Sequence, residues 1–266
     1  MHLNFPFSAV QIIWTLTFAA LLVLLVVLLG RDRTSRFPWF TGSIVLAGLT
    51  HLVSRLLFGR LPQLTFAAVS IVLADLSAIV GLVVLVELAH RVFGRASRRA
   101  WTIGTVTLLI AGGVVLAEWG TWPSVQTLKL ANPIAVLSLL QLIAEKAGIL
   151  SSVLTIGLGL LIVILGRRFG SGIRSHAQQI MIGLSLVALA QVGAQVIWQF
   201  IALHTVPHSL EEYQHVMAIK DRLINGNSAV YAAVVVGWVL CLWFDEPGSV
   251  QAPATSATEP PALPQA

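Results

Sequence analysis

The sequence predicts an all-α, polytopic membrane protein with seven transmembrane helices, on the basis of its composition, its length and the placement of its arginines. Of its 266 residues, 57% are hydrophobic and only 10% are charged, and the mean hydropathy is +0.88. Soluble domains carry about a quarter charged residues. Because each span needs about 20 apolar residues, seven spans with short loops use almost the whole length. We therefore expect one transmembrane domain over residues 1–246 and no soluble domain of ordinary size.

Seven apolar stretches define the expected spans. The first has no basic segment before it and several arginines after it, which is the reverse of a secretory signal peptide, so it is kept as a membrane helix. Trp101 and Trp119 bound the fourth stretch, as expected for an aromatic belt at the membrane interface. Residues 247–266 are rich in Pro, Ala and Thr and are expected to be disordered. The spans are expected at about residues 8–30, 38–58, 65–92, 101–119, 147–166, 177–203 and 228–244.

The fifth span is expected to begin inside a longer helix. Asn132 followed by Pro133 is an N-cap with proline at the first helical position. Residues 133–146 are interpreted as an interfacial or protruding part because Glu145 and Lys146 interrupt the hydrophobicity. Within the span, small residues recur on one face, which favours close packing of helices. They are Gly148, Ser152, Thr155 and Gly159.

Before the last span, residues 209–223 are expected to form a separate short amphipathic helix. Ser209 and Glu212 have the spacing of a capping box at its start. This helix lies in the loop that joins the last two spans.

The arginines predict the orientation. The first, third and fifth loops hold ten of the 16 basic residues, close to the helix ends. Cytoplasmic loops carry the excess of Lys and Arg, so we expect the N-terminus outside and the C-terminus inside. The ten are Arg31, Arg33, Arg36, Arg91, Arg95, Arg98, Arg99, Arg167, Arg168 and Arg174. The positive net charge is therefore explained by the basic residues of the cytoplasmic loops, and no nucleic-acid partner is expected.

Asp75 lies in the middle of the third span, where a carboxylate is costly unless it faces the bundle interior. On the preceding span, His51 and Arg55 lie one turn apart in the outer half. A short loop joins these two spans, so a contact of Asp75 with His51 or Arg55 is geometrically reasonable. Such pairing would remove much of the cost of burying either charge.

The sixth span adds Gln191, Gln195 and Gln199 at intervals of four residues, with Trp198 alongside. These residues also fall in the outer half, so several polar groups could converge on one outward-facing cavity that binds a small molecule or ion. The alternative is that they are interhelical hydrogen-bond partners with a purely structural role. The predicted ligand-binding set is His51, Arg55, Asp75, Gln191, Gln195 and Trp198.

Two other groups of polar residues suggest simpler roles. Glu87, His90 and Arg91 have the spacing of a structural ion pair near a helix end. In the outer loop, Glu212 and His215 have a Glu-x-x-His spacing that could place two metal ligands on one helix face. The weak metal-ligand candidates are His208, Glu212 and His215, with His204 nearby.

Three segments resemble a group of uncharacterised seven-span membrane proteins from bacteria of the acidobacterial kind. They are VELAHRVFGR, AEKAGILSSVLTIGLGLLIVILGRRFGSGIRSHAQQIMIGLSLVAL and GWVLCLWFDEP. The resemblance covers about half of the chain and implies the seven-span count and little else. The expected location is a bacterial inner membrane, which the chain crosses several times.

The functional hypothesis is a non-enzymatic membrane protein, either a receptor-like sensor or a ligand-binding accessory subunit. Lipid, a small-molecule ligand and a partner protein at the arginine-rich inner face are the expected partners, and the arginines could equally hold anionic headgroups. No cofactor is expected, because the last span has no lysine for a retinal Schiff base and the chain has no His-Glu-x-x-His motif. The alternatives are a proton-coupled transporter and, third, a membrane enzyme that uses the outer His and Glu residues.

Overall fold

All secondary-structure elements among the described residues are α-helices. The computed structural model describes residues 9–57, 59–93, 98–118, 133–165, 175–205 and 209–245, which form seven helices. The helices are α1 Ala9–Gly30, α2 Pro38–Leu57, α3 Gln63–Phe93, α4 Arg98–Glu118, α5 Pro133–Leu165, α6 His176–His204 and α7 Leu210–Trp243.

The predicted all-α class is confirmed for these residues. Six of the helices, all except α4, are long and apolar enough to cross a membrane. By helix length and hydropathy, the chain is therefore a multi-span helical membrane protein.

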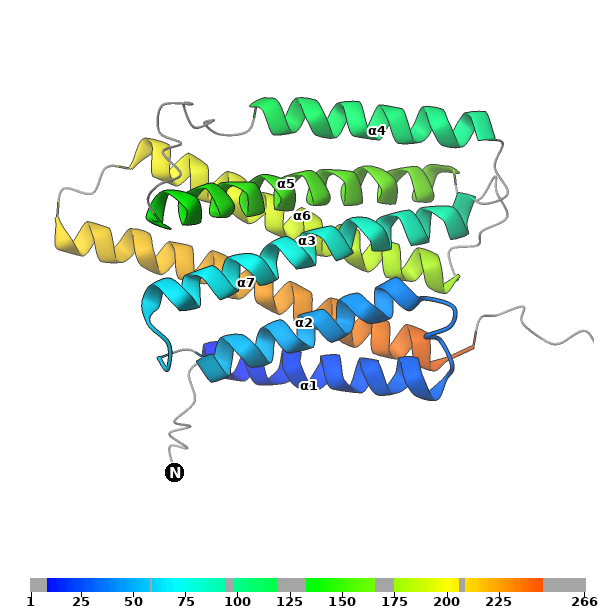
Figure 1. Ribbon diagram of the computed structural model, residues 1–266, viewed down its shortest axis with the longest axis horizontal. Coiled ribbons are helices and arrows are strands. Elements are labelled where there is room, and N and C mark those ends of the chain that lie inside the picture. The colour runs from blue at the N-terminus through cyan, green and yellow to red at the C-terminus, as the bar shows by residue number, and fades with distance from the viewer. Residues whose placement is uncertain are drawn as a thin grey trace, which may run out of the picture.

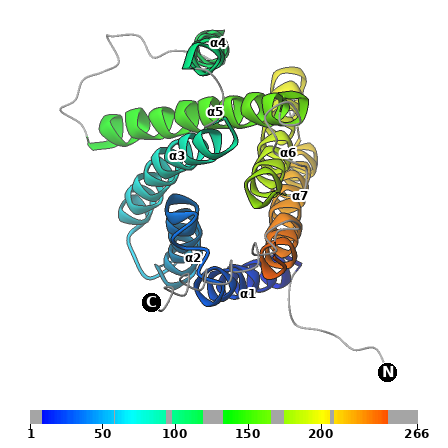
Figure 2. The ribbon, with the colours of Figure 1, turned by 90° about the vertical axis from the view of Figure 1, so that its right-hand side faces the viewer.

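Six of the seven helices form a closed ring (Figure 2). Helices that follow one another in the sequence run in opposite directions (Figure 1). Around the ring, each helix packs against the next in the order α1, α2, α3, α5, α6, α7, and α7 packs against α1. Helix α4 lies outside this ring, next to α5 (Figure 2). A smaller contact joins α3 to α6.

Two of the expected boundaries differ from the structure. Residues 133–146 and 147–166 belong to one helix, α5, which begins at Pro133 as expected. The expected short helix over 209–223 is not separate, because α7 continues without a break from Leu210 to Trp243. The Ile-Asn-Gly-Asn stretch at 224–227 is helical although Asn and Gly disfavour helix. The Ser209 side chain accepts a hydrogen bond from the Glu212 amide at 3.2 Å, as the capping box predicts.

The buried core lies at one end of the bundle, here called the arginine end. At this end α1 stops at Gly30, α2 begins at Pro38, α6 begins at His176 and α7 stops at Trp243. The opposite end is called the far end. The largest buried side chains of the core cluster come from α1, α2, α3, α5, α6 and α7 and include Leu24, Leu28, Phe40, Leu88, Ile162, Ile180, Met181 and Leu242. Phe40 and Trp238 meet edge to face with their ring centroids 5.2 Å apart.

Small residues allow the closest helix contacts. Gly159 of α5 lies against Ser185 of α6, whose hydroxyl donates to the Thr155 carbonyl at 3.2 Å. This confirms the predicted role of the small-residue stripe at Thr155 and Gly159. Gly148 takes no part in such a contact, because a Cβ built there has no neighbour within 4 Å. Gly183 of α6 makes a second close contact, against Trp238 of α7.

Candidate functional site

The predicted polar residues lie on the same helix faces as the buried core, but nearer the far end. On α2, His51 follows Ile44 by seven residues, which is two helical turns, and Ile44 is buried. On α3, Asp75 precedes Leu82 by the same interval, and Leu82 packs against the core. His51 and Asp75 are both half-buried. The core-facing stripe of each helix therefore turns from apolar to polar toward the far end.

The same change occurs on α6 and α7. Gln195 follows the buried Ala188 by seven residues. On α7, Tyr231 packs against the core cluster seven residues before the buried Trp238, and Asn227 comes one turn earlier. The Asn227 side-chain oxygen is buried and has no hydrogen-bond partner among the described residues. Tyr231 and Asn227 were not predicted, although their spacing from Trp238 is a signal that could have placed them.

His51 and Arg55, the two basic residues of the set, lie near aromatic rings. The His51 ring lies 6.4 Å from the ring of Tyr231 on α7. The Arg55 guanidinium lies over the Trp14 ring of α1, with its Cζ atom 5.8 Å from the ring centroid. Among the described residues, neither His51 nor Arg55 forms an ion pair with Asp75. The expected pairing across α2 and α3 is therefore not found, because both of its expected partners lie against α1 and α7 instead.

Gln191, Gln195 and Trp198 are half-buried on α6, across the ring from α2. Trp198 contacts α7, where the Lys220 ammonium lies 5.1 Å from the Trp198 ring centroid. The structure thus places Trp198 close to α7, the helix on which Tyr231 lies near His51. Helix α3, which carries Asp75, packs against both α2 and α6.

Packing differs between the two ends of the bundle. On α2, α3, α6 and α7, no described residue of the far half is buried, over residues 45–57, 63–83, 189–205 and 209–234. On α5, by contrast, Lys146 is 7% exposed and Ile149 is 1% exposed. The nearby Ser151 contacts Gly81 of α3, so part of α5 in this half is buried.

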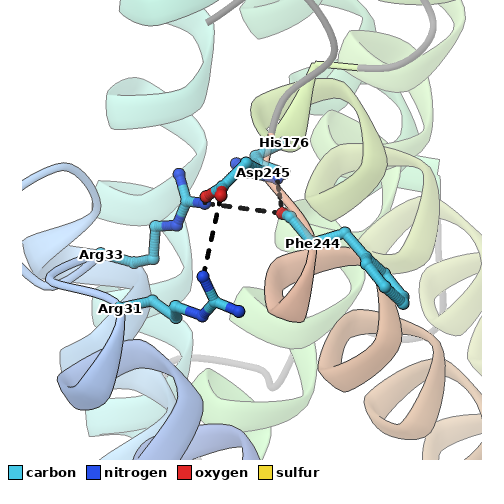
Figure 3. Close-up of polar contacts among 5 residues, drawn as sticks. All are labelled: Arg31, Arg33, His176, Phe244 and Asp245. Atoms are coloured by element: carbon cyan, nitrogen blue, oxygen red, sulfur yellow. Dashed lines mark hydrogen bonds and ion pairs between the residues drawn. The ribbon is translucent and has the colours of Figure 1, made fainter. Parts of the chain in front are cut away.

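The arginine end is held together by a cluster of polar contacts that sequence reasoning did not predict (Figure 3). Arg33, in the turn between α1 and α2, donates a 2.8 Å hydrogen bond to the Asp245 carboxylate at the end of α7. Its guanidinium also donates to the Phe244 carbonyl at 3.5 Å. His176, at the start of α6, bonds to the same carbonyl through Nε2 at 3.1 Å. Three segments that are distant in the sequence therefore meet at the last residues of α7.

Arg31 adds two weaker contacts to this cluster. Its guanidinium lies 3.7 Å from the other Asp245 oxygen and 5.5 Å from the Trp243 ring centroid. The side chains differ in exposure: Arg33 is 7% exposed, Arg31 is 41% exposed and Asp245 is 70% exposed. Nothing in the sequence distinguishes Arg33 from the other arginines of its turn, so only the tertiary packing selects it as the buried donor.

The predicted Glu87–Arg91 ion pair is confirmed, with a separation of 3.9 Å. The carboxylate also accepts a 3.0 Å hydrogen bond from the Phe40 amide. This amide is one of the first of α2, where backbone N–H groups have no partner within the helix. Glu87 therefore links α3 to the start of α2, and Arg91 also lies over the Phe37 ring at 4.7 Å.

The predicted metal ligands are only partly within the described residues. His208 lies outside them. Glu212 and His215 are exposed on α7, and the His204 ring stacks on Phe200 with centroids 4.3 Å apart. Among the described residues, no group of three potential ligands is close enough to hold a metal ion.

Comparisons with known proteins found no significant relative of this chain. No family model, curated protein or solved structure shows a significant match.

Proposed function

We propose that this protein is a seven-span membrane protein that binds a small polar ligand from the outer side, as a receptor-like sensor or ligand-binding subunit. In this proposal α4 is the seventh span, the N-terminus is outside and the arginine end faces the cytoplasm. The excess of arginine in the first, third and fifth loops supports this orientation. The bacterial inner membrane is proposed from the sequence resemblance.

One observation carries the proposal: polar side chains replace apolar ones on the inward stripes of four helices, in the half of the bundle where side chains stay accessible. Polar groups within spans are costly against lipid and usually face the interior. Asp75 is proposed as the charged anchor for the ligand. Gln191, Gln195 and His51 supply neutral donors and acceptors, which suit a small hydrogen-bonding solute.

Cysteine accessibility tests this arrangement. The only cysteine, Cys241, is first replaced by serine. Gln195→Cys and its neighbour Val196→Cys are then compared. Val196 is 47% exposed and lies in the same helical turn, on the side of α6 that faces away from the bundle interior. A membrane-impermeant, positively charged thiol reagent is applied to intact cells.

Gln195→Cys is expected to react and Val196→Cys to stay unmodified, since a thiolate does not form against lipid tails. Equal reactivity of the two positions, or no reaction at Gln195→Cys, would contradict the proposed polar interior.

Ligand binding itself is tested by mass spectrometry of the purified full-length protein. The small molecules extracted from the wild type are compared with those from Asp75→Asn. The matched control is Asp32→Asn, which removes an exposed carboxylate from the turn between α1 and α2. A species retained by the wild type and Asp32→Asn but lost from Asp75→Asn supports the proposal. Identical extracts from all three proteins would contradict it.

A receptor-like sensor must also pass its signal to the cell interior. The arginine end is proposed as the docking face for a cytoplasmic or membrane partner, and it could also hold anionic lipid headgroups.

A further inference from the structure

The ring of six helices divides into two similar halves. One half is α1, α2 and α3, and the other is α5, α6 and α7, with α4 outside the ring between them in sequence. Within each half, the middle helix packs against both of its neighbours. Two equivalent contacts, α3 with α5 and α7 with α1, join the halves and close the ring.

The two halves also run in the same direction. Each begins with a helix that runs toward the arginine end, returns, and runs toward that end again (Figure 1). The sequence Leu-Leu-Gly-Arg at 28–31 covers the end of α1, and the similar sequence Ile-Leu-Gly-Arg at 164–167 begins with the last two residues of α5. This arrangement is that of a parallel repeat related by an axis along the membrane normal, which occurs among transporters.

Each half has its own polar contact at the arginine end. In the first half, Glu87 at the end of α3 accepts from the Phe40 amide at the start of α2. In the second half, the Phe244 carbonyl after α7 accepts from His176 at the start of α6. In both halves the third helix is therefore linked to the second, so each half can move as a unit.

The contacts of Asp245 are different because they join the two halves. Its carboxylate follows α7 of the second half, whereas Arg31 and Arg33 belong to the turn between α1 and α2 of the first. At the far end, by contrast, the inward stripes carry accessible polar residues. Among the described ion pairs, those of Asp245 are the ones that cross between the halves.

We propose that the two halves rock against each other, and that the pairing of Asp245 with Arg31 and Arg33 is the inner gate of a transport pathway. The solute bound in the far half would then be carried across the membrane rather than only sensed. The structure corresponds to the outward-facing state, with the inner gate closed. This inference rests on the proposed outward-facing binding region. It also explains why an odd number of helices is compatible with a repeat, since α4 lies outside the ring.

The gate is suited to opening. Asp245 is mostly exposed, so its carboxylate exchanges protein contacts for water when the halves separate. Arg33 is almost fully buried and stays within the first half. Opening requires the loss of one short hydrogen bond and of the weaker contacts around it, and it also requires the apolar contacts between the halves, such as Phe40 against Trp238, to shift. The polar ties within each half stay unchanged.

Accessibility from the cytoplasmic side tests the gate. Gln195→Cys in the Cys241→Ser background is labelled in inside-out vesicles with the same impermeant reagent. Asp245→Asn is expected to raise the labelling rate by up to about tenfold, because it removes the negative charge that pairs with Arg31 and Arg33. Asp32→Asn removes an exposed carboxylate from the same turn as Arg31 and Arg33 but leaves Asp245 intact, so it is the matched control and is expected to leave the rate unchanged. An unchanged rate in Asp245→Asn would overturn the inner gate.

Movement of the halves is measured separately by distances between spin labels in the full-length protein. Ser35 in the first half and Ile164 in the second form a pair between halves, and Ser35 with His90 forms a pair within the first half. Asp245→Asn is expected to add a longer distance for the first pair and to leave the second unchanged. A change in both pairs, or in neither, would overturn rigid-body rocking.

These results are distinguishable from failure of the proposed binding region. If Gln195→Cys is not labelled from either side in any variant, the binding region itself is wrong. If it is labelled from outside but never from inside, the binding region stands and the gate is wrong.

Discussion

The contact between Gly183 and Trp238 provides the sharpest test of the packing at the arginine end. A Cβ atom at Gly183 would lie 2.7 Å from Cε2 of Trp238 and 2.8 Å from a methyl carbon of Val234. Trp238 is 3% exposed and its ring meets Phe40 edge to face, so it has little room to move. Gly183→Ala should therefore force α6 and α7 apart.

The magnitude follows from two opposing effects. Overpacking a well-packed core by one methyl group costs about 1–3 kcal/mol. Alanine is about 1 kcal/mol better than glycine within a helix, which offsets part of that cost. A net loss of about 1–2 kcal/mol is expected for Gly183→Ala. A loss of this size lowers the Tm by about 2–8 °C for a protein of this size.

Gly193 on the same helix provides the matched control, because a Cβ there has no neighbour within 4 Å. Gly193→Ala is expected to leave the Tm unchanged or to raise it by up to about 4 °C. The measurement is thermal unfolding of the full-length protein in detergent, followed by tryptophan fluorescence. If Gly183→Ala and Gly193→Ala have the same Tm, the close contact between α6 and α7 does not exist as described.

Three further predictions concern neighbouring contacts and use the same unfolding measurement. Gly159→Ala should be strongly destabilising on its own, and Ser185→Gly should restore part of the loss, because the added methyl group meets the Ser185 side chain; additive effects of the two changes would contradict this contact. Glu87→Gln should cost about 1–2 kcal/mol, since the Phe40 amide loses a charged acceptor, while Glu145→Gln, at an exposed position, should have no measurable effect. Arg33→Ala should cost about 1–3 kcal/mol and Arg31→Ala less than about 1 kcal/mol, because only the Arg33 side chain is buried; the reverse order would show that burial does not determine their contributions.

The polar residues of the far end could be predicted from the sequence only in part. The prediction placed His51 and Gln195 in the outer half of their spans and Asp75 in the middle of its span, and in the structure each lies seven residues from a core-facing position of its helix. It could not choose their neighbours, because helical spacing defines a face but not the helix that it meets. His51 therefore lies beside Tyr231 of α7, 180 positions away in the sequence, rather than beside Asp75.

The sequence by itself determined the class of protein, the helical segments and the side on which the arginines gather. These properties follow from local hydrophobicity and charge, which can be read directly from the sequence. Only the tertiary structure decided that α4 lies outside the ring, that the ring divides into halves and that Asp245 joins them. Apolar helices have similar surfaces, and which pairs pack is decided by the fit of particular small and large side chains, such as Gly183 against Trp238.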